Sequence, residues 1–328
     1  MELRIAYFSP FLPAEWIAAF GLRPSRVLPR GGGAEEAGLP RGGCPFAHAL
    51  VREVEALAAE RKIGAAVFAT TCDQVRRAAE DVAAAELPVF LFNVPHTWGT
   101  AVAAGLYLEE LRRLGRFLEE LGGRSPSPEG LVDTCLAFDG ARRRLLEVRP
   151  FLGAREWASA SVSFQARGGP DPAIPVKGKL RKGIPLALAG GPLWGEHLDL
   201  YDLVENAGGR VALDWTEWGE RTFPRPLRRR FLGENPLMEL TEAYFGGIPA
   251  PFRRPDSALF SGLGREIRER GIKGILLARP LFCDFWQVAA ARLAEWTDLP
   301  LVELDLAGER GGMDRLRSRV EALVEMLR

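Results

Sequence analysis

The sequence has few side chains of the kinds that bind metal ions through nitrogen or pair as disulfides. Its 328 residues include 3 histidines and 4 cysteines. So few histidines nearly exclude a histidine-rich zinc site, and so few cysteines exclude a disulfide scaffold at this length. We therefore expect the cysteines to act as metal ligands or in chemistry rather than as bridges.

The sequence also has no net charge at pH 7 and no long apolar run. The 43 basic residues balance 43 acidic ones, which excludes a polybasic protein that binds nucleic acid. No run approaches the roughly 18 apolar residues of a membrane helix. Charged residues and prolines interrupt the first 16 residues, MELRIAYFSPFLPAEW, so that they do not read as a signal peptide. We expect a cytoplasmic protein that binds neither nucleic acid nor a membrane.

Several common catalytic motifs are absent. The chain contains no GxxxxGK[ST] phosphate loop, no GxSxG and no HExxH, and its AGGPLWGEH stretch differs from GxGxxG. These absences predict that the chain neither hydrolyses ATP itself nor binds a dinucleotide in the usual way.

Short apolar runs bounded by glycine or proline alternate with longer amphipathic stretches. The runs lack polar alternation, which is typical of parallel strands covered on both faces. Alternation of such strands with helices predicts an α/β fold with parallel sheets. The predicted strands are Leu3–Phe8, Ala65–Ala69, Val89–Phe92, Leu186–Ala189, Val211–Leu213, Gly274–Ala278 and Leu301–Leu304.

An internal repeat divides the chain. Residues 64–94 and 274–306 each read strand, loop, Cys-Asp, helix, Leu-Pro, strand. We therefore predict a first α/β domain at 1–100, a helical segment at 101–164, an exposed linker at 165–184 and a second α/β domain with a C-terminal helix at 185–328. Within the second domain, the proline-rich segment 223–255 is interpreted as a surface arm.

Three cysteines lie where such a fold places ligands. Cys72 and Cys283 occupy equivalent positions in the repeat, just after a strand and before a helix, and Cys44 also precedes a predicted helix. Ligands of open α/β sheets bind outside the carboxyl ends of the strands. Three thiolates suit an open [4Fe–4S] cluster, while zinc with one further ligand and three inert buried cysteines remain alternatives. Cys135 lies within a predicted helix and is interpreted as a core residue.

At these residues the sequence resembles the 2-hydroxyacyl-CoA dehydratase D-component family, which includes cluster subunits of benzoyl-CoA reductase and double-cubane cluster proteins. The resemblance covers most of the chain. It rests on LPAEWIAAFGLRPSRV near the start, Cys44-Pro45, ATTCDQVRR around Cys72, LFCDFW around Cys283 and SRVEAL near the end.

The resemblance implies two flavodoxin-like parallel-sheet domains with an inserted helical segment. It implies that Cys44, Cys72 and Cys283 hold a [4Fe–4S] cluster, or half of a double cubane shared between chains. It also implies a related second subunit, in a heterodimer or homodimer, a separate iron–sulfur ATPase activator, and oxygen-sensitive one-electron reduction of an acyl-CoA thioester. The alternatives are a non-catalytic electron-relay or scaffold subunit and a cluster-free α/β binding protein.

Three further residues are candidates within this hypothesis. Glu15 and Ser9 follow the first predicted strand, so we interpret them as catalytic groups that supply a proton or position a ligand. Glu15 alternatively starts a helix after Pro13. Arg221 is interpreted as a residue that holds a phosphate of coenzyme A, with a surface salt bridge as the alternative.

Overall fold

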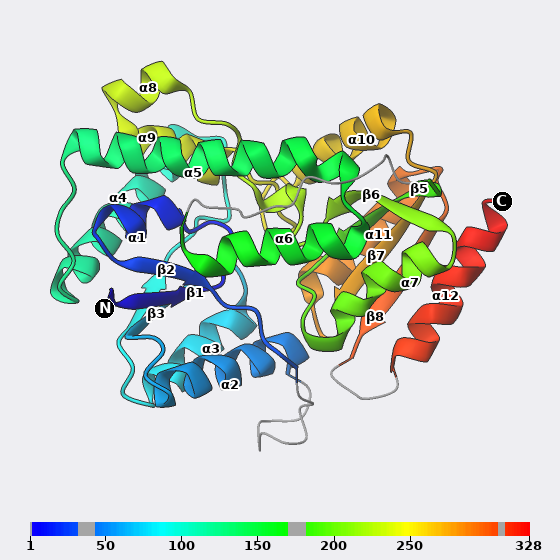
Figure 1. Cartoon of the computed structure of the whole chain (residues 1–328), viewed down its shortest axis with the longest axis horizontal. Coiled ribbons are helices and arrows are strands. Elements are labelled where there is room, and N and C mark those ends of the chain that lie inside the picture. The colour runs from blue at the N-terminus through cyan, green and yellow to red at the C-terminus, as the bar shows by residue number, and fades with distance from the viewer. Residues whose placement is uncertain (1, 32–42, 170–181, 308–311) are drawn as a thin grey trace.

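The chain folds into two halves that each contain a parallel sheet with helices on its faces (Figure 1). This computed structural model describes residues 2–31, 43–169, 182–307 and 312–328. Most of the predicted linker, residues 170–181, lies outside these ranges. In the described part of the chain, no helix has both the length and the apolar character needed to cross a membrane.

The first sheet has the strand order β2-β1-β3-β4, and all of its pairs are parallel. Ile5 on the central strand β1 pairs with Pro24 on one side and Ala65 on the other. The elements of this half are β1 (Arg4–Tyr7), α1 (Ala14–Ala19), β2 (Arg23–Arg26), α2 (Pro45–Ala59), β3 (Ala65–Ala69), α3 (Asp73–Ala83) and β4 (Val89–Phe92).

The second sheet repeats this arrangement with the order β6-β5-β7-β8, again with parallel pairs. Both orders match the first four strands of the flavodoxin-like order 2-1-3-4-5. The elements are β5 (Ile184–Gly190), α7 (Leu200–Asn206), β6 (Gly209–Trp215), α8 (Arg229–Glu234), α9 (Pro236–Thr241), α10 (Ser257–Arg270), β7 (Gly274–Pro280), α11 (Asp284–Trp296), β8 (Leu301–Leu306) and α12 (Gly312–Met326).

The predicted α/β fold is confirmed, and seven of the eight strands coincide with predicted apolar runs. Strand β2, with the sequence RPSR, has no apolar run to reveal it. Its Pro24 is compatible with its place at the edge of the sheet, where one side of the strand needs no ladder partner.

Three helices connect the two sheets: α4 (Ala101–Glu120), α5 (Pro128–Val148) and α6 (Ala154–Arg167). Helix α6 contacts both halves. The Ser25 hydroxyl on β2 donates to the carbonyl of Ala166 over 2.9 Å, and the Trp157 indole donates to the Asp214 carboxylate over 2.9 Å. Figure 1 shows α6 crossing between the sheets. This helix therefore helps to fix the two sheets relative to each other.

The interpretation of segment 223–255 as a surface arm is wrong. Leu240 and Ala243 are fully buried, and they pack with Ile5 and Tyr107 in the core of the first half. The segment leaves the second sheet, covers the first one and returns to α10. Its apolar residues therefore complete a core that residues 1–120 leave open.

A buried carboxylate holds this returning segment in place. Glu239 on α9 accepts hydrogen bonds from the side chains of Arg225 and Arg228, each with a shortest distance of 2.7 Å. Burial alone would raise the pKa of Glu239, but the hydrogen bonds from the two arginines lower it to about 2. An acid with a lowered pKa stabilises the fold above its unfolded pKa, and this contribution is lost as the pH falls.

We expect Glu239→Gln to reduce the free energy of unfolding by about 2–3 kcal/mol near pH 7, because it leaves two arginines without a carboxylate. The difference from the wild type should shrink as the pH falls from about 4.5 toward about 2. Urea unfolding at several pH values measures it.

Glu234→Gln is the matched control. Glu234 pairs with Arg230 at the surface, where both side chains are largely exposed, so its loss should change stability by less than about 1 kcal/mol. A Glu239→Gln variant as stable as this control at pH 7 would contradict the assignment.

Candidate functional site: a pocket with three cysteines

The three predicted ligand cysteines line one pocket between the two halves. The empty space that it encloses, together with the open solvent at its mouth, is about 680 Å³. The described residues that line it are Phe8, Ser9, Pro10, Phe11, Cys44, Phe46, Thr71, Cys72, Gln74, Val75, Pro192, Glu217, Ala250, Pro251, Phe252, Pro280, Cys283, Phe285 and Trp286. Loops that are far apart in sequence thus contribute the three cysteines to one pocket.

Each of these cysteines is the N-cap residue of a helix. Cys44 precedes α2, Cys72 precedes α3 and Cys283 precedes α11, and none of the three makes a side-chain capping hydrogen bond. Helices α4 and α5, by contrast, begin with capping hydroxyls of Thr100 and Ser127. The thiols therefore lie at the positive ends of three helix dipoles, which favours thiolates or an anionic group.

The pocket lies at the topological switch points of both sheets. Ser9 follows β1 and Cys72 follows β3, and these two strands are neighbours from which the chain continues in opposite directions. In the second half, Pro192 follows β5 and Cys283 follows β7 in the same relation. Ligands of flavodoxin-like sheets bind at this point.

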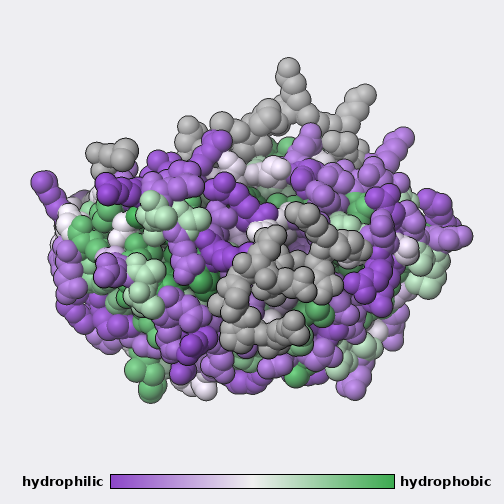
Figure 2. Space-filling model, turned by 90° about the horizontal axis from the view of Figure 1, so that it is seen from below, coloured by the Kyte–Doolittle hydropathy of each residue, from purple (hydrophilic) through white to green (hydrophobic). Residues whose placement is uncertain are grey.

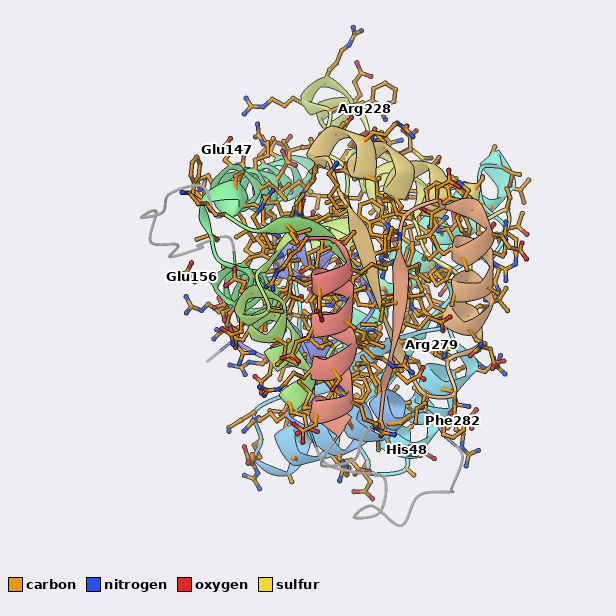
Figure 3. All side chains as sticks on the ribbon, turned by 90° about the vertical axis from the view of Figure 1, so that its right-hand side faces the viewer. His48, Glu147, Glu156, Arg228, Arg279 and Phe282 are labelled. Atoms are coloured by element: carbon orange, nitrogen blue, oxygen red, sulfur yellow. The ribbon has the colours of Figure 1, made fainter. Side chains whose placement is uncertain are left out.

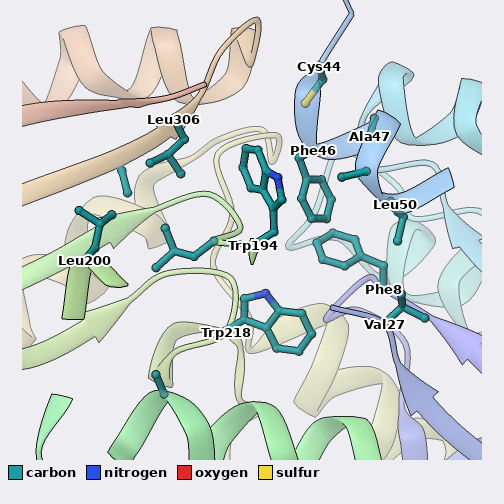
Figure 4. Close-up of a cluster of buried hydrophobic side chains, with 14 of the residues drawn as sticks. Phe8, Val27, Cys44, Phe46, Ala47, Leu50, Trp194, Leu200, Trp218 and Leu306 are labelled. Atoms are coloured by element: carbon teal, nitrogen blue, oxygen red, sulfur yellow. The ribbon is translucent and has the colours of Figure 1, made fainter. Parts of the chain in front are cut away.

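Aromatic packing between the halves forms the base of the site (Figure 4). Phe46, two residues after Cys44, packs against Trp194 of the second half with ring centroids 5.5 Å apart, and against Phe8 at 4.6 Å. Phe8 in turn contacts Trp218 at 6.3 Å. The cysteine loops thus stand on one continuous core, so the halves cannot separate without exposing these rings.

Burial controls the protonation of the three thiols. It raises the pKa of Cys44 to about 11 and that of Cys283 to about 12, although first-turn backbone N–H groups act in the opposite direction. Burial raises the pKa of Cys72 as well. The charges of Cys44 and Cys72 raise the pKa of Cys283 further, because the sulfurs share the pocket. A chain without metal therefore holds neutral thiols at pH 7.

Two local features fix the cysteine loops. The Gln74 side chain on α3 accepts a hydrogen bond from the backbone N–H of Cys44 over 3.2 Å, which joins the Cys72 loop to the Cys44 loop. Phe282, next to Cys283, has a φ of 61° and exposes 58% of its surface. A positive φ is rare and costly for a bulky residue. Figure 3 shows the Phe282 ring at the periphery of the molecule.

Ser9 lies in the same pocket as the cysteines. Its side chain is buried, and its hydroxyl oxygen accepts a hydrogen bond from the backbone N–H of Phe11 over 3.3 Å. This contact leaves the hydroxyl proton free to point into the pocket.

Glu15 lies on α1 and is not among the described residues that line the pocket. Its carboxylate is fully buried, pairs with Arg142 over 2.9 Å and accepts a hydrogen bond from the Tyr244 hydroxyl over 2.6 Å. The Glu15 side chain thus joins α1 to α5 and to the returning segment. The catalytic role predicted for Glu15 stays a prediction, and the structure gives this residue a structural one.

Arg221 has a different environment from the one expected for a residue that holds a phosphate. Its guanidinium is buried and pairs with Glu217 over 2.9 Å, and it donates to the carbonyls of Trp215 and Pro249 over 3.0 and 2.9 Å. It also donates to the carbonyl of Gly190 over 3.3 Å. The salt bridge given as the alternative is therefore present, but it is buried rather than at the surface, and the role of Arg221 in holding a phosphate of coenzyme A stays a prediction.

Glu217 is the site residue that the sequence did not reveal. Among the described lining residues it is the one acidic side chain, and its charge raises the pKa of Cys283. It follows strand β6 within the stretch WTEWGER. An acidic residue just past the carboxyl end of a parallel strand was the available signal.

A sequence model of the 2-hydroxyglutaryl-CoA dehydratase D-component family matches residues 10–327. The chain belongs to this family. The match covers all three pocket cysteines and every strand of the two sheets except β1. Members of the family are components of 2-hydroxyacyl-CoA dehydratase systems.

Other comparisons add little to the family assignment. No curated protein matches the chain. Among solved structures, the SBP FpvC from Pseudomonas aeruginosa in complex with Mn²⁺ is 14% identical, with coverage of 100% of this chain and 98% of that one and a TM-score of 0.26. A Mn-bound mutant of a periplasmic metal binding protein from Candidatus Liberibacter asiaticus is 11% identical, with 100% coverage of both chains and a TM-score of 0.27. Neither likeness contributes to the assignment.

The donor geometry also bears on the kind of metal centre that fits this family member. Within the described ranges, no three His, Cys, Asp or Glu side chains lie close enough to hold a single metal ion. Tetrahedral zinc would require sulfurs about 3.8 Å apart, given Zn–S bonds of about 2.3 Å. A cubane binds each thiolate to a different iron and so accepts wider spacing. Three thiols are also the donor type that iron–sulfur clusters use.

We expect the pocket cysteines of the metal-free chain to react slowly with iodoacetamide near neutral pH. Burial raises the pKa of Cys44 from its ordinary value of 9.0 to about 11, which reduces the thiolate fraction near neutral pH about 100-fold. Because the pKa is raised, labelling should accelerate as the pH increases toward 11. Mass spectrometry of native chain labelled between pH 7 and 10 measures each site.

The same chain unfolded in guanidinium chloride is the control, since its thiols regain ordinary pKa values. Cys72 is partly exposed, so the reagent can reach it and its labelling rate reports on its pKa. If Cys72 in the native chain were labelled at pH 7 as fast as in the unfolded chain, the environment assigned to it would be wrong.

Proposed function

We propose that Cys44, Cys72 and Cys283 hold a [4Fe–4S] cluster and that the chain is the iron–sulfur subunit of an acyl-CoA dehydratase or reductase. One observation carries the proposal: three helix-capping cysteines from both halves line a single apolar pocket at the switch points of the sheets. Family membership makes the chain a component of a dehydratase-type system.

When bound, such a cluster supplies single electrons of low potential. The residues of this chain control its surroundings. The rings of Phe46, Phe252 and Phe285 exclude water from the pocket, and low solvent exposure is one of the factors that set the potential of a cluster. First-turn N–H groups of α2, α3 and α11 favour the thiolate form of the cysteines. Loading therefore releases protons from thiols that are neutral in the empty chain.

The reaction is a one-electron reduction of a CoA thioester, which leads to loss of a 2-hydroxyl group or to reduction of a ring. The chain lacks a phosphate loop, so a separate iron–sulfur ATPase activator supplies the electron. A related second subunit completes the complex. Ser9, at the pocket wall, is the nearest of the predicted catalytic groups to the cysteines.

A second candidate function is electron relay without thioester chemistry. The burial of Arg221 favours it, because the residue predicted to hold a CoA phosphate is engaged by Glu217 and by backbone carbonyls instead. In this alternative the related subunit binds the thioester, and this chain passes electrons to it.

Chain purified without oxygen should be brown and contain about four irons and four sulfides. Cys72→Ala should lose most of this iron and the EPR signal of the reduced cluster. Cys135→Ala is the matched control: Cys135 is buried in α5 outside the pocket, so its removal should leave the iron content unchanged.

A colourless anaerobic preparation without iron would overturn the cluster and favour a cluster-free α/β protein. Equal iron loss from both variants would show that the cysteines act through stability. With the cluster present, acyl-CoA added to activator-reduced chain separates the two functions: reoxidation by thioester alone supports catalysis, whereas reoxidation only with the second subunit supports relay.

A further inference from the structure

One carboxylate oxygen of Glu217 accepts no hydrogen bond from any described residue. Its Oε1 pairs with Arg221 over 2.9 Å, while its buried Oε2 has no hydrogen-bond partner among the described residues. Oε2 lies 4.0 Å from Nη2 of Arg26, beyond hydrogen-bond reach, and that nitrogen already donates to the Glu217 backbone carbonyl over 2.9 Å. A buried oxygen left unpaired costs about 1–3 kcal/mol, so it calls for a ligand.

The environment of Oε2 restricts what this ligand is. Oε2 belongs to a residue of the cysteine pocket, whose other described walls are apolar or uncharged apart from the thiols. Glu217 and Cys283 line the same pocket. A group that binds three thiolates and one carboxylate oxygen in an apolar pocket is a cation or a metal cluster.

The topology of the two halves makes Glu217 the counterpart of Cys44. Cys72 and Cys283 follow β3 and β7, the third strands of their halves. Cys44 lies in the connection after β2, the second strand of the first half, and Glu217 lies in the connection after β6, the second strand of the other half. Each half thus offers one donor after its second strand and one after its third.

We propose that Glu217 supplies the fourth protein ligand, through Oε2, to the iron that the three cysteines leave open. The inference rests on the proposed function, because it requires a cluster at Cys44, Cys72 and Cys283. The Fe–O bond forms from a carboxylate lone pair and displaces a water molecule, so nothing is oxidised or reduced. Arg221 positions the carboxylate by holding Oε1.

The consequence is a resting cluster with three thiolates and one carboxylate rather than an open iron. A substrate oxygen reaches that iron only by displacing Oε2. Arg221 and Arg26 are cations that would remain beside the displaced carboxylate.

Loss of the fourth iron tests the assignment without an activity measurement. Anaerobic chain is treated briefly with ferricyanide, and iron content and the EPR signal of a [3Fe–4S] cluster are followed. Glu217→Gln and Glu217→Ala should lose the fourth iron at least about tenfold faster than the wild type. Glu217→Cys should retain it, because a cysteine completes an all-thiolate set.

Asp73→Asn is the matched control. Asp73 follows Cys72 directly, yet its side chain is 98% exposed and does not line the pocket. This variant removes one negative charge near the cluster without removing a ligand, so its fourth iron should behave as in the wild type. Circular dichroism and thermal unfolding identify any variant that fails to fold, and Glu217→Gln preserves the shape of the side chain.

The outcomes separate the two proposals. A wild-type chain without iron overturns the proposed function and this ligand with it. A four-iron wild type whose Glu217→Gln and Glu217→Ala variants keep the fourth iron overturns the ligand alone. Equal acceleration in Asp73→Asn also overturns it, because the effect would then come from charge rather than from coordination.

Discussion

Packing of the two sheets end to end is the constraint on which the site depends. The carboxyl ends of β1 and β3 face those of β5 and β7, and the rings of Phe8, Phe46, Trp194 and Trp218 fill the space behind them. Burial of these aromatic side chains contributes several kcal/mol. The face of the molecule seen in Figure 2 carries mainly hydrophilic side chains with scattered apolar ones, whereas the cysteine pocket is lined mainly by apolar side chains.

Local sequence was enough to predict the elements that carry the cysteines. Buried parallel strands are short apolar runs, and glycine or proline marks their ends, so β3, β4 and β7 were found within two residues of their limits. Because the repeat placed Cys72 and Cys283 after equivalent strands, one topological rule predicted both positions. The rule concerns the carboxyl edge of a sheet and needs no knowledge of how the two sheets meet.

Features that depend on how the two halves pack against each other could not be predicted from local sequence patterns. The segment with Leu240 and Ala243 is rich in proline and charge, which is typical of surface loops, and only the open core of the first half explains its burial. The burial of Arg221 was not predictable either. Its backbone partners include Gly190, whose φ of 130° and contact with the Ala278 carbonyl leave no room for a side chain. Such contacts follow from tertiary packing.

Electrostatics give a reason why an acid is kept in this apolar pocket. Burial of Glu217 between Arg26 and Arg221 removes three charges from water, and an apolar replacement of similar volume often stabilises a protein. Burial lowers the pKa of Arg26 to about 10, which shows that removal from water destabilises its charged form. Two arginines with one carboxylate leave excess positive charge around Glu217. An anionic iron–sulfur centre at Cys44, Cys72 and Cys283 would balance it, and the free Oε2 of Glu217 would then have the partner that the protein alone does not provide.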